Sequence, residues 1–249
     1  MSLAEADLTY FQRGIVENPK FWRRLGSKPE LKGLTTLDVG CGHGSLCVDM
    51  AMSGAQRVIG VDLDESRISF ARENLAVNYP ALEGVVDFRC CDVSEVPERD
   101  FDLVVSKDTF EHVVGLESCV GDIAGRMKPG GKLYVGFGPL YRSPRGDHRR
   151  TRAMVPWGHV LIPDRFLIAR LNRSGAKVRG IEDLGLNGLS VREYRAIFEN
   201  SGLEIASFRV NASRHPISLV FSLFRSIPWL GEYFSHNLYC ILRKPSTHC

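Results

Sequence analysis

The sequence predicts an α/β fold built on a mostly parallel sheet with helices on both faces. Apolar runs alternate with helical periodicity from residue 35 to about residue 138. The strand candidates are continuous apolar runs, which is typical of strands buried on both faces. The chain has 249 residues, 44% hydrophobic and 24% charged, enough for one sizeable domain with a substantial core. This composition excludes a disordered chain, a collagen-like chain and a disulfide-rich miniprotein.

The elements of the first half are each marked by their own pattern. Residues 1–33 form a helical lead-in that is expected to fold over the carboxyl edge of the sheet. Strands are predicted at 35–39, 57–62, 85–91, 101–105 and 132–137. A helix runs to Met52 and is stopped by Gly54, and the next is capped by Asp64. A further helix at 116–127 leads to a turn at 128–131.

The second half contains more sequence than one crossover connection needs. Asp164 is predicted to cap a helix ending at Gly175, and Ser190 with Glu193 forms a capping box for a helix ending near Gly202. The last two strands are predicted at 203–210 and 238–242, with a buried helix at 217–224 followed by Pro228, Trp229 and Leu230. The expected organisation is a single domain, 1–249, made of a lead-in at 1–33, a ligand-binding core at 34–138, a cap at 139–202 and a closing segment at 203–249.

Cysteine usage and hydropathy indicate a reduced, cytoplasmic protein. The chain has seven cysteines, an odd number, and none of them forms a C-x-x-C pair. Charged residues interrupt the N-terminal stretch, so no signal peptide is predicted. No apolar run reaches the ~18 residues of a membrane-spanning helix. Peripheral membrane contact through residues 217–224 remains an alternative to burial.

The net charge of +3 is concentrated in one segment. Residues 142–152 hold five arginines against one aspartate, a local charge of +4, while the rest of the chain carries −1. An extended basic face of the kind that binds duplex nucleic acid is therefore not predicted.

A glycine-rich turn after the first strand is the most informative local feature. The sequence Gly40-Cys41-Gly42-His43-Gly44 joins strand 35–39 to a helix, so backbone N–H groups and a helix N-terminus can approach a ligand closely. Asp62 ends the second strand, 20 residues after Gly42, where it can accept from ribose hydroxyls. Asp92, just past the third strand, can accept from the amine of a base. Together they predict a nucleoside site.

These segments resemble class I S-adenosylmethionine-dependent methyltransferases, and in particular the ubiquinone-biosynthesis-type small-molecule methyltransferases. The resemblance covers roughly residues 34–138. It rests on five motifs in order: 37–44, 58–62, 91–93, 101–106 with 110–113, and 127–131. It implies a Rossmann-like seven-stranded sheet with an antiparallel last strand, and S-adenosyl-L-methionine as the cofactor.

The resemblance also implies which residues contact the cofactor. They are Gly40, Cys41, Gly42 and Gly44 at the methionine part, Asp38 at its amino end, Asp62 at the ribose, Leu63, Asp92 and Val93 at the adenine, and Ser106 on the floor near the methyl group. The remaining task of such a protein is to hold donor and acceptor in line, because the sulfonium carries its own leaving group.

A general base is needed only if the acceptor arrives protonated, and histidine suits that role near neutral pH. The candidates are His112, His148 and His159, each with a structural role as the alternative. The acceptor pocket is predicted to include Phe110, Tyr141, Arg149, Arg150 and Trp157, although aromatic side chains more often belong to a core. No metal site is predicted, since Asp147, His148 and His159 lack a recognised ligand spacing.

The arginine-rich segment has three interpretations: a cap over an acidic acceptor, a solvated surface, or a contact with nucleic acid. Residues 106–109 read Ser-Lys-Asp-Thr. They lack the Asn/Asp-Pro-Pro-aromatic motif of family members that methylate base amino groups, which argues against a DNA amino-methyltransferase.

The predicted function is methyl transfer to a small molecule, with an oxygen acceptor slightly favoured over nitrogen or carbon. An NAD-dependent oxidoreductase is one alternative, although the glycine spacing is GxGxG rather than GxGxxG. A non-catalytic cofactor-binding module is the other. The sequence carries no signal for an oligomeric state.

Overall fold

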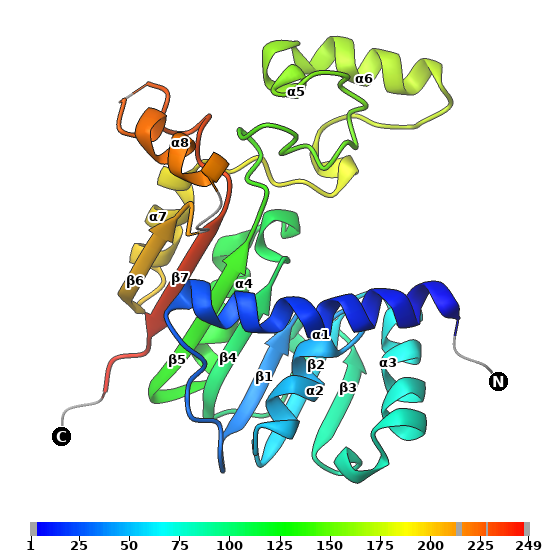
Figure 1. Cartoon of the computed structure of the whole chain (residues 1–249), viewed down its shortest axis with the longest axis vertical. Helices are drawn as coiled ribbons and strands as arrows, with labels where there is room; N and C mark the ends of the chain where they lie inside the picture. The colour runs from blue at the N-terminus through cyan, green and yellow to red at the C-terminus, as the bar shows by residue number, and fades with distance from the viewer. Residues whose placement is uncertain (1–3, 213–215, 228, 247–249) are drawn as a thin grey trace.

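The computed structural model describes residues 4–212, 216–227 and 229–246, and its centre is one seven-stranded sheet (Figure 1). The strand order is β3-β2-β1-β4-β5-β7-β6, in which β7 runs antiparallel to β5 and β6 and the other neighbouring pairs are parallel. The strands are β1 (Thr35–Val39), β2 (Arg57–Asp62), β3 (Val86–Cys90), β4 (Phe101–Lys107), β5 (Met127–Phe137), β6 (Glu204–Val210) and β7 (Leu238–Arg243). The predicted Rossmann-like sheet with an antiparallel last strand is confirmed.

Helices cover both faces of this sheet. On one face, α4 (Leu116–Arg126) and α7 (Val191–Asn200) bury Val120, Ile123 and Tyr194 against the strands. On the other, α1 (Glu5–Leu25), α2 (Ser45–Met52) and α3 (Glu65–Asn78) form a second core that includes Trp22 and Met50. Burial of such large side chains stabilises each layer by roughly 1.5–3 kcal/mol per residue, as an upper estimate.

The predicted element boundaries hold closely where local chemistry sets them. The Asp64 side chain accepts hydrogen bonds from the backbone N–H groups of Ser66 and Arg67 and so caps α3. Ser190 and Glu193 form the predicted capping box before α7. Asp164 is not a cap: it is the first residue of α6 (Asp164–Arg173), and Pro163 stands at the N-cap position. The short helix α5 (Gly158–Leu161) was not predicted.

The predicted turn at 128–131 is part of β5 instead. This strand begins at Met127, and the Gly130 N–H donates to the carbonyl of Lys244 at 2.9 Å. The Lys244 N–H in turn donates to Gly131 at 2.9 Å. Pairing with the chain beyond β7 thus extends the strand through a sequence that looks like a turn, and an irregularity of register opposite Phe101 accommodates it.

The segment after β5 rises above the carboxyl ends of the parallel strands. It carries α5, α6 and a single-turn helix, η4 (Glu182–Leu184), before the chain returns through α7 (Figure 1). The long helix α1 crosses the sheet near the same edge (Figure 1). Two segments far apart in the sequence therefore flank one end of the sheet.

The expectation of a buried helix at 217–224 is wrong for its described side chains. Helix α8 spans Pro216–Arg225, but Leu223 is 72% exposed and Val220 is 48% exposed. The helix packs through Phe221 against Trp157 and Phe234, at the cap rather than on the sheet. Trp229 is exposed, and Pro228 lies outside the described residues. In the part of the chain that the structure describes, no helix is both long and apolar enough to cross a membrane.

Candidate functional site

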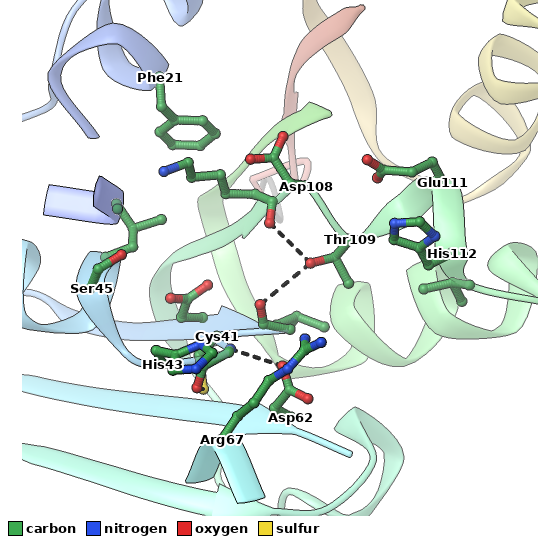
Figure 2. Close-up of a pocket in the computed structure, with 18 of the residues that line it drawn as sticks. Phe21, Cys41, His43, Ser45, Asp62, Arg67, Asp108, Thr109, Glu111 and His112 are labelled. Carbon is green, nitrogen blue, oxygen red and sulfur yellow. Dashed lines mark hydrogen bonds between the residues drawn. The ribbon is translucent and has the colours of Figure 1, made fainter. Parts of the chain in front are cut away.

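A cavity of about 1000 Å³ opens at the carboxyl ends of β1, β2 and β4, beneath α1 (Figure 2). This is where ligands bind in open α/β sheets. Of the residues predicted from the sequence, the following line it: Asp38, Gly40, Cys41, Gly42, Asp62, Leu63, Asp92, Val93, His112, His148 and Arg150.

The glycine-rich turn forms the floor of this cavity. Gly40, Gly42 and Gly44 all adopt left-handed conformations, with φ of 77°, 53° and 82°. The N–H groups of Gly40 and Cys41 donate to the carbonyl of Val61 at 2.8 and 3.0 Å and tie the turn to β2. A Cβ at Gly40 would also collide with the Thr109 side chain. The turn therefore needs glycine both for its conformation and for its close approach to Thr109, which follows β4.

Gly44 and Ser106 have structural roles beside this turn. Gly44 is the N-cap residue of α2, and a Cβ there would collide with Phe88. Ser106 is buried, and its hydroxyl donates to the carbonyl of Val39 at 2.9 Å, joining β4 to β1. Neither residue lines the cavity, and both support its floor from behind.

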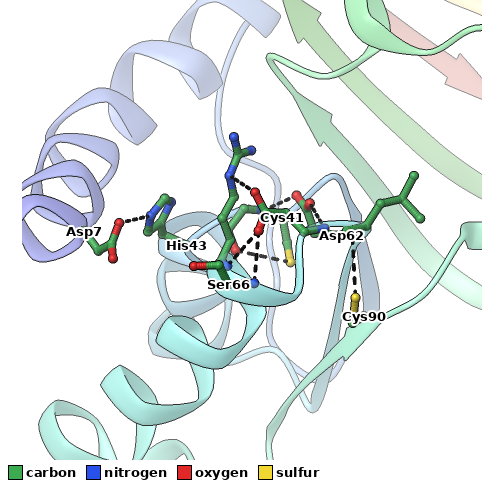
Figure 3. A network of polar contacts seen from close by, with 10 residues as sticks. Asp7, Cys41, His43, Asp62, Ser66 and Cys90 are labelled. Atoms are coloured by element: carbon green, nitrogen blue, oxygen red, sulfur yellow. Dashed lines mark hydrogen bonds and ion pairs between the residues drawn. The ribbon is translucent and has the colours of Figure 1, made fainter. Parts of the chain in front are cut away.

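Asp62 is held at the end of β2 by two backbone donors. Its Oδ2 accepts from the Gly42 N–H at 2.8 Å and its Oδ1 from the Asp64 N–H at 3.0 Å (Figure 3). The carboxylate thereby fixes the glycine-rich turn relative to β2 while its remaining lone pairs face the cavity. Leu63, which is 73% exposed, follows it at the rim.

Asp92 occupies the matching position after β3. It caps the single-turn helix η2 (Val93–Glu95) through a capping box with Glu95. The hydrogen bond to Ser94 lowers the pKa of the Asp92 carboxyl below its ordinary value, so the group is an ionised acceptor at neutral pH. Val93 is buried beside it and offers an apolar surface.

Asp38 is a buried carboxyl at the inner wall. It is 1% exposed, and the Cys47 thiol donates to its Oδ2 at 3.3 Å. Burial raises the pKa of Asp38 to about 7, against a lowering by the thiol bond and by the Lys107 charge. A buried carboxylate facing a cavity with so weak a donor is suited to receive a cationic group.

The far end of the cavity holds polar groups from two loops. Glu111 and His112 lie in η3 (Phe110–His112), just after β4, and His148 lies in the loop after β5. Burial raises the pKa of Glu111 to about 8 and lowers that of His148 to about 4. Burial also lowers the pKa of His112. The two imidazoles are therefore neutral at pH 7.

Arg150 borders this end, while Arg149 does not line the cavity. The Arg150 guanidinium lines the cavity and donates to the carbonyls of Leu184 and Gly185 at 2.6 and 2.7 Å. Arg149 is exposed, in a left-handed conformation with φ of 64°. The structure thus separates two neighbouring arginines that the sequence treats alike.

Four other predicted residues lie in the core or the cap. Phe110 is fully buried between Phe137 and Phe198. His159 is 1% exposed and donates from Nε2 to the Tyr141 carbonyl at 2.5 Å, with the Tyr141 ring 5.2 Å from its own. The Trp157 indole N–H donates to the Tyr233 carbonyl at 2.9 Å. None of these four residues lines the cavity in this structure; their side chains pack or form hydrogen bonds within the core and the cap.

Sequence reasoning placed the N-terminal lead-in over this edge but named none of its lining residues, and it missed those at the end of β4. From α1 the cavity is lined by Tyr10, Arg13, Gly14, Glu17, Lys20, Phe21 and Arg24. His43 Nε2 lies 3.0 Å from Asp7 Oδ1 and links this helix to the glycine-rich turn (Figure 3). Lys107, Asp108, Thr109 and Glu111 complete the wall (Figure 2). All four lie at or just after the end of a parallel strand, and this position is the sequence feature that could have identified them as cavity residues.

Known proteins are similar to this chain over the segment that carries most of the cavity. A family model described as a methyltransferase domain matches residues 30–137, which include the glycine-rich turn, Asp62, Asp92 and Glu111. The chain is 38% identical to the ubiquinone biosynthesis O-methyltransferase of Bradyrhizobium diazoefficiens over 117 residues, 47% of this chain and 44% of that protein. It is 28% identical to the human mitochondrial ubiquinone biosynthesis O-methyltransferase over 214 residues, 78% of this chain and 55% of that protein. The chain thus spans about half the length of the curated relatives it matches.

Solved structures share the fold at low sequence identity. An S-adenosylmethionine-dependent methyltransferase from Mesorhizobium loti superposes with a TM-score of 0.60 at 20% identity, covering 92% of this chain and 97% of that one. The magnesium protoporphyrin IX methyltransferase of Synechocystis, solved with bound S-adenosylmethionine, gives 0.53 at 17%, covering 96% and 82%. Residues 30–137 thus match a methyltransferase domain, and the chain shares the fold of solved S-adenosylmethionine-dependent methyltransferases.

Proposed function

We propose that the protein transfers a methyl group from S-adenosylmethionine to a small-molecule acceptor, with oxygen favoured over nitrogen or carbon. One observation carries the proposal: a single cavity joins the glycine-rich turn, Asp62 and Asp92 at one end to Glu111, His112 and His148 at the other. The first set suits a nucleoside and the second suits an acceptor. We further propose that residues 1–249 act as one domain in the reduced environment of the cytoplasm.

The residues of the first set fit the cofactor chemically. The buried Asp38 carboxylate suits the ammonium of its methionine part, and the Asp62 and Asp92 carboxylates suit ribose hydroxyls and an adenine amine. Glycine at position 40 keeps the floor free of a side chain. When bound, the sulfonium supplies an activated methyl group and its leaving group. The protein then positions the acceptor in line with that methyl group, which alone accounts for several kcal/mol of rate enhancement.

The groups for handling a proton are His112 and His148. Both line the cavity and are neutral at pH 7, so each has a ring nitrogen able to accept a proton from an acceptor hydroxyl. His159 has no such role, because it is buried against Tyr141.

The two other functions are less well supported. The methyltransferase model matches the same segment in which a dehydrogenase would carry its dinucleotide motif. A non-catalytic module would not need the polar cluster at the far end of the cavity, where Glu111 is held in the interior at 4% exposure.

A labelled-donor screen tests the proposal. Purified protein is incubated with methyl-labelled S-adenosylmethionine and a metabolite extract, and a labelled small-molecule product is expected. Calorimetry should show micromolar binding of S-adenosylmethionine and of S-adenosylhomocysteine. Binding without any labelled product across extracts would favour the non-catalytic module, and binding of NAD in place of both would favour the oxidoreductase.

An acidic acceptor would be contacted by Arg150. Replacing Arg150 with alanine should raise the acceptor KM about tenfold, the loss of ~1.4 kcal/mol from a guanidinium–anion contact. Arg149→Ala is the matched control, because that side chain is exposed outside the cavity, and its KM should stay unchanged. Equal effects of the two variants would contradict an acidic acceptor at Arg150.

A further inference from the structure

The turn at residues 110–113, called the acceptor turn below, is held by one residue of the cap, Asn187. The Asn187 side-chain amide donates to the carbonyls of Phe110 at 2.6 Å and of Val113 at 3.2 Å. The backbone N–H of Asn187 donates to the carbonyl of Glu111 at 3.1 Å. A helix of a single turn leaves its carbonyls without partners of its own. A residue more than 70 positions away in the sequence therefore supplies partners for three of them.

Asn187 is itself fixed on the protein core. Its Oδ1 accepts from the Tyr194 hydroxyl at 2.9 Å and from the Leu189 N–H at 3.2 Å. Tyr194 is 1% exposed, and its ring lies 4.8 Å from that of Phe137, the last residue of β5. Two donors therefore face the amide oxygen while two carbonyls face the amide nitrogen, so the amide has one satisfied orientation.

The same short segment of the cap fixes the imidazole of His112. The His112 Nδ1 lies 2.7 Å from the Gly185 carbonyl. A carbonyl oxygen can only accept, so the proton is on Nδ1 and the lone pair is on Nε2. Leu186, between Gly185 and Asn187, is 1% exposed and anchors the segment in the interior. Residues 185–187 thus hold both the backbone of the acceptor turn and the tautomer of its histidine.

The side chain of Glu111 depends on this backbone support. Within the described residues its Oε2 is buried without a hydrogen-bond partner, and its Oε1 accepts from the Gly138 N–H at a long 3.3 Å. The residue is 4% exposed. Figure 2 shows the side chains of Glu111 and His112 next to each other. Because their own contacts fix them weakly, the orientation of the acceptor turn decides that Glu111 rather than its neighbour Phe110 faces the cavity.

From these contacts we infer that Asn187 is a positioning residue for methyl transfer, which holds the acceptor turn so that Glu111 and His112 meet the acceptor in one orientation. The inference rests on the proposed function, in which the neutral His112 ring takes a proton from the acceptor. The tautomer held by Gly185 leaves Nε2 as the nitrogen for that step. Asn187 itself does not line the cavity, so it acts through the turn and not through a contact with the acceptor.

Nuclear magnetic resonance of isotope-labelled histidine measures this positioning without reference to activity. At a pH where the ring is neutral, His112 should carry its proton on Nδ1, and the spectrum of His112→Gln assigns the signal. Asn187→Ala should give a mixture of both neutral tautomers, because the turn can then move away from the Gly185 carbonyl. Asn172→Ala is the matched control and should leave the tautomer unchanged. The Asn172 amide also donates to a carbonyl of the cap, that of Val178 at 2.9 Å, but Asn172 lies in α6 and not at the acceptor turn.

Kinetics uses a dilution series of the metabolite extract as the source of acceptor, with labelled S-adenosylmethionine at saturation. A displacement of about 1 Å can lower a rate about 100-fold, so Asn187→Ala should lower the maximal rate about tenfold to 100-fold and leave the half-saturating dilution within about threefold. Asn172→Ala should keep the full rate. Both variants should bind S-adenosylhomocysteine like the unaltered chain, which shows that they fold and that the nucleoside end is intact.

Asn187→Asp separates positioning from stability. The carboxylate can still accept from the Tyr194 hydroxyl and the Leu189 N–H, but it cannot donate to the carbonyls of the acceptor turn. The backbone N–H that binds the Glu111 carbonyl is present in every variant. Asn187→Asp should therefore lose as much of the maximal rate as Asn187→Ala, while its thermal unfolding stays closer to that of the unaltered chain.

The two measurements separate the possible results. An unchanged His112 tautomer in Asn187→Ala, or a full maximal rate in either Asn187 variant, would overturn the positioning role. Equal losses of rate in Asn172→Ala and Asn187→Ala would also overturn it, because a weakened cap would then explain both. If no extract yields a labelled product while Asn187→Ala still shifts the His112 tautomer, the proposed function is wrong and the hold of Asn187 on the acceptor turn stands.

Discussion

Replacing Asp62 with alanine should weaken the binding of S-adenosylhomocysteine about 100-fold, the equivalent of ~2.7 kcal/mol. Two losses add up. The carboxylate is a charged acceptor for the ribose hydroxyls, and charged hydrogen bonds contribute about 1.5–3 kcal/mol each. It also accepts from the Gly42 N–H at 2.8 Å, so its removal frees the glycine-rich turn. Isothermal titration calorimetry measures the change directly.

Asp64→Ala is the matched control for this experiment. Asp64 lies two residues further along the same loop, but its carboxylate caps α3 through Ser66 and Arg67. Its loss should cost about 1 kcal/mol of unfolding free energy, measured by urea denaturation, and leave the affinity within about twofold. If both variants lose affinity to the same extent, loop disorder rather than a missing carboxylate explains the effect, and the ribose assignment is wrong.

The cofactor end of the site was predictable because its constraints are local. A glycine-rich turn directly after a strand fixes where the backbone approaches a ligand, and Asp62 and Asp92 follow their own strands immediately. Parallel strands bring their carboxyl ends to one edge, so three short motifs suffice to place the nucleoside end. The same locality explains why the caps at Asp64 and Ser190 were found.

The acceptor end depends on single-residue differences that sequence patterns do not resolve. Phe110 and Glu111 are neighbours in one short turn, yet the first enters the core and the second faces the cavity. His148 lines the cavity, whereas its neighbour Arg149 is exposed outside it. The loop that carries them has left-handed residues at 145, 148, 149 and 152. Such an irregular backbone does not produce the regular spacing of apolar residues by which helices and strands are predicted.

The placement of α1 and α8 depends on long-range contacts. The Trp22 indole donates to Asp49 at 2.8 Å, and Arg24 donates to the Tyr239 hydroxyl, 215 residues away, at 2.7 Å. These contacts set which face of α1 looks into the cavity. For α8, apolar composition suggested burial, but composition does not reveal that only part of the helix finds a partner at the cap.

Cofactor affinity should depend on pH through Asp38. Its folded-state pKa is about 7 because of burial, and the groups that act on it are Cys47, Lys107 and Asp62. An ammonium from the ligand favours the ionised carboxylate, so the complex forms with release of a proton when the free protein is protonated. Affinity for S-adenosylhomocysteine should approach a tenfold fall per pH unit well below pH 7, which amounts to roughly 30-fold between pH 8 and 5.5, and it should be nearly level above about pH 8.

Asp38→Asn isolates this contribution. The variant should bind S-adenosylhomocysteine more weakly at pH 8 and lose most of the pH dependence of binding. Calorimetry in buffers of different ionisation enthalpy should show that its proton release at pH 6 is gone.

In the free protein, the effect of Asp38 on folding stability changes with pH in the opposite direction. Because the folded pKa lies above the ordinary value of 3.8, Asp38 stabilises the fold at low pH, and this stability is lost as pH rises from about 4 to about 7. A bound ammonium removes that penalty, so the thermal shift on adding S-adenosylhomocysteine should be larger at pH 8 than at pH 5.5. An equal shift at both pH values would mean that Asp38 does not face the amino end of the cofactor.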